Sequence, residues 1–195
     1  MVFGMSENME YVKAVVYDLE SENFRIFENS PVKDMVRSAR VRCVQLLHSL
    51  GVPCTESVIL VAPNRAEHVN TAVNRVSQIY ERLNEQLRAN GFRVSLQPII
   101  EVLDLTQSQT ERLIPLAHRR LLSSLDRALN HVSEIMDNLE AITEQVRLRR
   151  VKANLRRLAN NWNTVFETAR RLGIDISRDY NVLVELIDEA LRRCA

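Results

Sequence analysis

The stretch LAHRRLLSSLDRALNHVSEIMDNLEAITEQVRLRRVKANLRRLANNWNTVFETARRL, residues 116–172, holds 57 residues without a glycine or a proline. Its apolar residues recur at intervals of three and four, so the pattern predicts α-helix throughout. A single straight helix of this length would extend for about 85 Å, far longer than a small domain. How this stretch folds therefore decides the arrangement of the second half of the chain.

Two apolar stripes divide the stretch. The first consists of Leu121, Leu125, Ala128, Val132, Ile135, Leu139, Ile142 and Val146, and the second of Leu148, Val151, Leu155, Leu158, Trp162, Val165, Ala169 and Leu172. They are out of phase, because a continuation of the first stripe would place Arg149 or Arg150 among apolar side chains. The pattern favours a turn near residues 145–150, which gives an antiparallel helical hairpin. The alternative is one continuous helix that changes its packing partners.

The first stripe also predicts an interface between two copies of the chain. A helix over residues 116–146 is about 46 Å long, more than a small sheet can cover. Part of its apolar stripe is therefore expected to need a second chain, as in a packed helix–helix seam. The contact residues expected for this homodimer are Leu125, Val132, Leu139, Ile142 and Val146.

The first hundred residues alternate between strand and helix patterns. Strands are expected at residues 11–19 and 23–28, which together read as a β-hairpin, and at residues 57–62 and 92–103. Helices are expected from Ser30-Pro31 to Gly51 and from Pro63-Asn64 to Asn90-Gly91, with start and stop signals at both ends of each. Strand, helix and strand at the later spacing predict a right-handed crossover between parallel strands. Pro98 predicts an edge position or a bulge in the last strand.

Further signals organise the second half. Ser108 with Glu111 has the spacing of a capping box, as do Asn64 and Glu67 earlier in the chain. Pro115 predicts a kink or a helix restart, and a last helix is expected from Ser177 to about residue 193. The expected fold class is α+β: a small mixed sheet domain in the order ββαβαβ over residues 1–104, then a long helical hairpin and a C-terminal helix over residues 105–195.

Composition limits the classes of function. The chain has 26 basic and 25 acidic residues, so it has no overall field that would recruit nucleic acid or an anionic membrane, and only a local patch could do so. Its three cysteines show no paired spacing, which indicates a reducing, cytoplasmic compartment. No signal peptide is visible at residues 1–10, and no run of 18 apolar residues predicts a membrane span.

The most basic window extends over residues 147–157. It contains Arg147, Arg149, Arg150, Lys152, Arg156 and Arg157, and Trp162 follows one turn later. Arginine forms bidentate contacts with phosphate, so such a helix can lie along a nucleic-acid backbone. Alternatively, the hairpin pairs the charges internally, with Glu144 facing Arg150 and Asp137 facing Arg157. The spacing of Trp162 places it on the apolar seam.

A second candidate site is the helix start after the apolar strand of residues 57–62. Asn64, Arg65 and His68 could hold a small anion or a nucleotide there, because the N–H groups of a helix N-terminus are unpaired. Asp18 and Asp104 would join them only if their strands run parallel. The junction lacks a Gly-rich loop, and Asn64 is equally explained as a helix cap.

No catalytic centre, metal site or cofactor is expected. The chain contains no Glu-x-x-His, no His-x-x-x-His and no phosphate loop. Three hypotheses remain, in this order: a non-enzymatic scaffold that oligomerises through its long helices, a nucleic-acid-associated protein that uses residues 147–157, and an anion- or nucleotide-sensing α/β domain.

Overall fold

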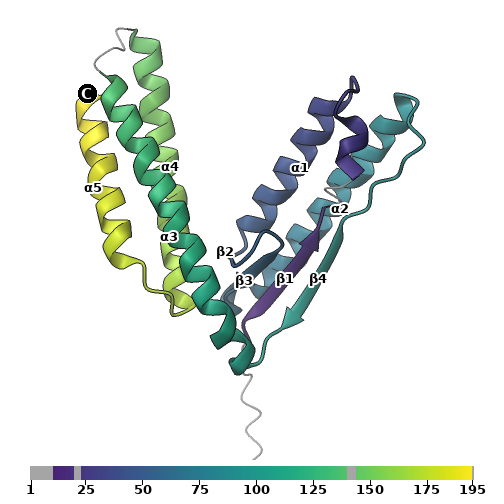
Figure 1. Ribbon diagram of the computed structural model, residues 1–195, viewed down its shortest axis with the longest axis horizontal. Coiled ribbons are helices and arrows are strands. Elements are labelled where there is room, and N and C mark those ends of the chain that lie inside the picture. Colours follow the sequence, from purple (N-terminus) through teal and green to yellow (C-terminus); the bar gives the residue numbers. More distant parts are fainter. Residues whose placement is uncertain (1–10, 20–22, 140–143, 195) are drawn as a thin grey trace, which may run out of the picture. The chain divides into compact units, whose positions relative to one another are not determined.

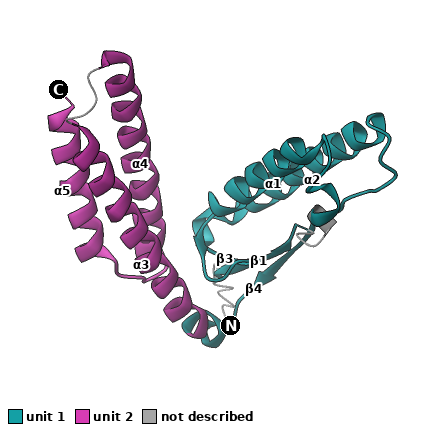
Figure 2. Ribbon diagram, turned by 45° about the horizontal axis from the view of Figure 1, so that its top comes forward, with its two compact units in different colours: residues 1–111 teal, residues 112–195 magenta. Residues whose placement is uncertain are grey.

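The computed structural model describes residues 11–19, 23–139 and 144–194 and has an α+β fold, as expected. Two compact units follow each other in the sequence (Figure 2). Unit 1 comprises residues 1–111 and unit 2 comprises residues 112–195.

Unit 1 consists of an antiparallel sheet covered by two helices (Figure 1). Its strands are β1 (Lys13–Asp18), β2 (Val52–Pro53), β3 (Val58–Val61) and β4 (Ile99–Asp104), its helices are α1 (Lys33–His48) and α2 (Ala66–Ala89), and its 3-10 turns are η1 (Asn23–Phe27) and η2 (Pro63–Arg65). The strand order is β2-β3-β1-β4, and each neighbouring pair is antiparallel. Figure 2 shows α1 and α2 side by side on one face of the sheet.

The parallel pairing expected after residue 57 is wrong, and the sheet is not mixed. Strands β3 and β4 run in the same direction and are joined through α2, but β1 lies between them and is antiparallel to both. Val15 in β1 faces Ile59 of β3 on one side and Val102 of β4 on the other. The connection through α2 therefore joins two strands that are not neighbours, because β1, which comes earlier in the chain, lies between them. Strand β4 is an edge strand, which is one of the two positions that Pro98 predicted.

The expected β-hairpin is also wrong. Residues 23–27 form the turn η1, whose backbone is satisfied locally: the Glu28 N–H donates to the Arg25 carbonyl and the Ser30 N–H to the Phe27 carbonyl. The Phe27 ring is buried and meets Phe92 edge to face, with the ring centroids 5.4 Å apart. A tertiary aromatic contact thus outweighs the strand propensity of this segment.

The short strand β2 was not anticipated from the sequence. It follows Gly51, where a Cβ atom would lie 1.9 Å from the Leu60 carbonyl oxygen. Glycine is therefore needed for the backbone to approach β3 this closely.

A buried amide holds the segment between α2 and β4. The Asn84 Nδ2 donates to the Leu96 carbonyl at 2.8 Å, and the Leu96 N–H donates to Asn84 Oδ1 at 2.8 Å. Residues 92–98 are extended without strand partners, and this pair of bonds replaces the ladder that they lack. The Leu96 side chain is then buried in the core under α1 and α2.

Neither of the two expected capping boxes is formed. Neither η2 nor α2 has a side-chain hydrogen bond at its N-cap, so Asn64 and Glu67 do not cap. The box at the start of α3 (Gln107–Asn138) lies two residues earlier than Ser108 and Glu111: the Gln109 N–H donates to Thr106 Oγ1, and the Thr106 N–H donates to Gln109 Oε1. Pro115 lies inside α3, so the helix does not restart there.

Unit 2 contains the expected helical hairpin. It comprises α3, α4 (Gln145–Arg171) and α5 (Ser177–Arg193), and Figures 1 and 2 show the three helices lying alongside one another. Helix α3 ends at Asn138 and α4 begins at Gln145, so the two helices are separate as expected, and residues 140–143 are outside the described part. The third helix, α5, packs against α4. The rings of Phe166 and Tyr180 stack on each other there, with their centroids 4.3 Å apart.

Candidate nucleic-acid interface

The first three turns of α4 carry a strongly basic surface. The 27 residues of α4 include eight basic residues and one acidic residue, Glu167. Five of the basic residues, at 100° of rotation per residue, occupy an arc of about 160° on the side away from the buried Leu155. We call this arc the basic face; it consists of Arg149, Arg150, Lys152, Arg156 and Arg157.

The basic face is not neutralised by the neighbouring helices in the part of unit 2 that the structure describes. All ion pairs there join residues three or four positions apart, and none involves the basic face. Glu144 pairs with Arg147 at 3.0 Å instead of with Arg150. The pairing of Asp137 with Arg157 that the hairpin suggested is absent from the ion pairs of the described residues.

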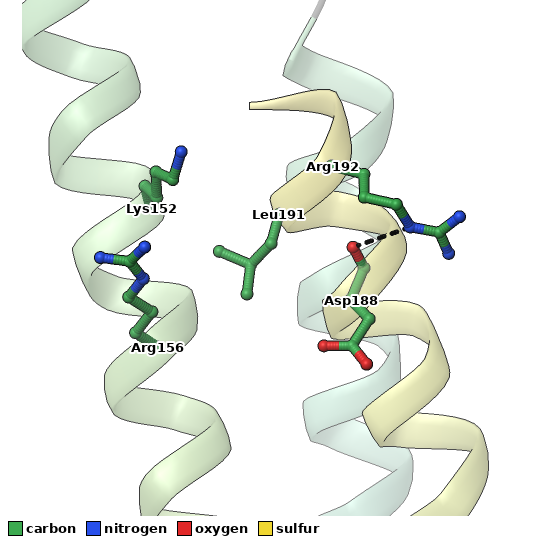
Figure 3. Close-up of a pocket in the computed structure, with 5 residues that line it drawn as sticks. All are labelled: Lys152, Arg156, Asp188, Leu191 and Arg192. Atoms are coloured by element: carbon green, nitrogen blue, oxygen red, sulfur yellow. Dashed lines mark hydrogen bonds between the residues drawn. The ribbon is translucent and has the colours of Figure 1, made fainter. Parts of the chain in front are cut away.

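The basic face continues into a groove between α4 and α5. The groove is open, has a volume of about 690 Å³ and is lined by Lys152, Arg156, Asp188, Leu191 and Arg192. Figure 3 shows Lys152 and Arg156 on α4 facing Leu191 on α5. The lining holds three cations and the carboxylate of Asp188, and the two cations from α4, Lys152 and Arg156, have no ion-pair partner among the described residues, which makes this groove favourable for an anion.

The cation on the α5 side of the groove is held in place. The Arg192 Nε donates to the Asp188 carbonyl at 3.4 Å, and its guanidinium pairs with Glu189 at 3.1 Å. The sequence pattern did not identify Asp188, Leu191 or Arg192, because they belong to a helix more than 30 residues later. Only the packing of α5 on α4 brings them to the basic face.

Neutral polar residues extend the surface beyond the cations. Asn160 and Asn161 are exposed one turn after Arg157, and they offer hydrogen-bond donors and acceptors to a ligand that lies along the helix. Trp162 is half-buried, so part of its ring is covered by the bundle and it is not a free stacking platform.

The predicted oligomer contacts lie mostly inside unit 2. Leu125, Val132 and Leu139 are buried within the single chain, whereas Val146 is 61% exposed at the start of α4. Ile142 lies outside the described residues. The stripe that was expected to need a second chain is thus covered largely by α4 and α5, and a helical dimer interface stays a prediction.

The residues predicted to bind a small anion lie near one another, but the structure adds no further observation in favour of an anion site there. Asn64 and Arg65 belong to η2, and His68 lies in the first turn of α2, with its Nδ1 3.8 Å from Glu67 Oε1. Strands β3 and β4 end on the same side of the sheet, so Asp104 lies at this end. Asp104, however, pairs with Lys13. Asp18 lies at the opposite end of β1, so this site also stays a prediction.

The cysteine and histidine environments in the described residues do not form a reactive centre. Burial raises the pKa of the Cys43 thiol to about 11, against a smaller opposing effect of Arg42, so this thiol stays protonated at neutral pH. The Tyr17 hydroxyl donates to the Glu56 carbonyl at 2.7 Å and lies 3.0 Å from His48 Nε2. No group of three histidine, cysteine or acidic residues in the described part is close enough to hold a metal ion.

None of the described helices combines the length and the apolar character that crossing a bilayer requires. Comparison with protein-family models, with curated proteins and with solved structures found no match for this chain.

Proposed function

We propose that the protein is a non-enzymatic binding protein that holds nucleic acid on the basic face of α4. The observation that supports this most directly is the set of five cations on one arc of α4, four of them exposed and Lys152 half-buried, without an ion-pair partner among the described residues. Leaving five like charges together is unfavourable for the isolated chain, and a polyanion removes that repulsion. The three cysteines are free thiols, two of them buried, which supports a cytoplasmic, reducing location.

The arrangement of the cations favours a phosphate backbone over a membrane surface. Arg149 and Arg157 are separated by about 12 Å along the helix axis, which corresponds to a few phosphates in a row. A helix that lies on a membrane presents large apolar residues beside its cations. The apolar residues within the arc of the basic face are only Ala153 and, at the start of α4, the exposed Val146.

Binding through five phosphate contacts has a defined dependence on salt. The logarithm of the association constant should fall with the logarithm of the salt concentration with a slope of about −4.5 for duplex DNA. Raising the salt from about 50 to about 200 mM should then weaken binding by on the order of 500-fold.

The test replaces three of the five cations. The triple variant Arg149→Gln, Arg150→Gln and Lys152→Gln should retain about two phosphate contacts, so its slope should be about −1.8 and its affinity should fall for every DNA sequence. The matched control replaces three exposed arginines of α2, Arg75, Arg82 and Arg88, by glutamine. Fluorescence anisotropy with labelled duplexes at several salt concentrations measures both quantities.

Two outcomes would overturn the proposal. One is the absence of DNA and RNA binding by the wild-type protein at low salt. The other is equal weakening by the α2 control, which would assign binding to net charge alone. Because the control removes the same charge from unit 1, the comparison separates the basic face from a general electrostatic effect.

A further inference from the structure

The outer edge of β4, which pairs with no other strand in the described part of the chain, carries several exposed apolar side chains. β4 is the last strand in the order β2-β3-β1-β4, and Ile99, Val102 and Leu103 are 58%, 40% and 46% exposed. Proteins commonly protect sheet edges with lysine, proline or very short strands. The opposite edge, β2, has only two residues, one of them Pro53, whereas the six residues of β4 contain neither lysine nor proline and only two charged residues, Glu101 and Asp104.

The register shows which backbone groups of β4 face outward. The Leu105 N–H donates to the Val12 carbonyl of the chain segment before β1. In an antiparallel ladder, alternate residues direct their N–H and C=O groups to the same neighbour. Ile99, Glu101 and Leu103 therefore face β1, and the backbone groups of Ile100, Val102 and Asp104 point away from the sheet.

We propose that this edge pairs with β4 of a second copy of the chain, antiparallel, with Val102 opposite Val102 of the second copy. In this register Ile100 lies opposite Asp104, so all three outward-facing residues pair with outward-facing residues. Each chain contributes three N–H donors and three carbonyl acceptors, which gives six hydrogen bonds between the strands.

Other registers are less favourable. A two-fold axis perpendicular to the sheet keeps each face of the sheet continuous between the two copies. In every such register, the residue numbers of two directly opposed residues add up to an even number. The next shift in one direction places Glu101 opposite Glu101 and Asp104 opposite Pro98, which has no N–H. The next shift in the other direction places Leu103 on the axis and Ile100 opposite Thr106, which already caps α3. The edge is therefore complementary to itself in one register.

The pairing would produce an eight-stranded sheet with α1 and α2 of both copies on the same face. The exposed side chain of Val102 would gain its own copy as a neighbour on the helix-covered face. On the open face, Leu103 would lie opposite Glu101 and Ile99 opposite Leu105. This interface uses unit 1 only, so it is independent of the basic face on α4.

The first experiment blocks the outward backbone without disturbing the sheet. Val102→Pro removes an N–H that β1 does not use, so the fold should persist while the dimer is lost. Val102→Thr keeps the N–H and the branched shape and should remain dimeric. Sedimentation equilibrium should give twice the 22.5 kDa chain mass for the wild-type protein and for Val102→Thr, and the single chain mass for Val102→Pro. Far-UV circular dichroism checks the fold.

The second experiment tests the register and does not depend on the proline variant folding. Directly opposed residues have Cα atoms about 5.5 Å apart, within the range that a disulfide can join. In a Cys194→Ser background, Val102→Cys should form an intermolecular disulfide under mild oxidation. The control is Val182→Cys on α5, a position that is 49% exposed and should stay reduced. A monomeric wild-type protein, a folded Val102→Pro dimer, or equal cross-linking at both positions would overturn the proposal.

Discussion

At the scale of single residues, the amide of Asn84 determines how α2 connects to β4. The side chain is 9% exposed and provides both hydrogen bonds of the Leu96 backbone. Without it, a buried donor and a buried acceptor would lack partners, because residues 92–98 belong to no strand.

Asn84→Ala should therefore lower the free energy of unfolding by about 2–4 kcal/mol, the cost of leaving two buried backbone groups unsatisfied. The matched control is Gln86→Ala, an exposed position on the same helix, which should change stability by less than about 0.5 kcal/mol. Urea denaturation measures both. A loss for Asn84→Ala no greater than that of the control would show that the Leu96 backbone finds other partners.

At the scale of elements, side-chain hydrogen bonds near the first residues of α3 and α5 decide where these helices begin. Thr106 and Gln109 bond each other's backbone N–H groups at the start of α3. At the start of α5, Asp175 Oδ1 accepts from the Ser177 hydroxyl at 2.6 Å and from the Ser177 N–H at 2.9 Å. The helix begins at Ser177 as expected, and the carboxylate two residues earlier accepts from its first N–H group.

The two bonds from Ser177 hold the pKa of Asp175 below its usual value of 3.8, with a smaller contribution from His118. A depressed pKa means that the carboxylate stabilises the folded state above the ordinary value and that this contribution is lost as the pH falls through the folded value. Asp175→Ala should consequently be less stable than wild type at pH 7, and the difference should shrink as the pH falls below 3.8.

Urea denaturation of both proteins at a series of pH values tests this expectation. Asp126→Ala, an exposed position on α3, provides the control and should show no such convergence. A difference between Asp175→Ala and wild type that stays constant into acid would refute the role of the carboxylate.

At the scale of the whole molecule, the balanced charge of the chain hides two unequal units. Residues 1–111 contain 11 basic and 14 acidic side chains, a net charge of −3, and residues 112–195 contain 15 basic and 11 acidic side chains, a net charge of +4. Unit 2 is therefore the one suited to a polyanion.

Because the first apolar stripe is buried within unit 2, a substitution in it should affect the folding of unit 2 and not only the association of two chains. Leu125→Asp should unfold unit 2 at every protein concentration, because it places a charge at a position with 0% exposure and should cost about 4 kcal/mol or more. Val146→Asp, at 61% exposure, should keep full helicity. Circular dichroism over a range of concentrations measures helicity. Retained helicity in Leu125→Asp would contradict the observed packing. Dissociation of an oligomer by Val146→Asp would instead support the predicted helical dimer interface.

The sequence by itself determined the α+β class, the helices and their buried faces. These features follow from local periodicity, since a helix buries residues three and four apart whatever its partner is. Val76, Tyr80 and Leu83 recur at intervals of four and three and are buried on α2, and Gly91 follows the end of that helix with a φ of 83°. The composition of the basic window was equally visible in the chain.

Only the tertiary structure decided the rest. The order of the strands depends on pairing between residues far apart in the chain, so the connection through α2 could not reveal that β1 separates β3 from β4. Likewise, residues 23–28 have a strand-like pattern, but the contact of Phe27 with Phe92 makes them a turn. Whether the cations of α4 face acidic residues depends on how three helices are rotated against one another. That rotation is set by the packing of the apolar stripes, and it leaves the basic face exposed.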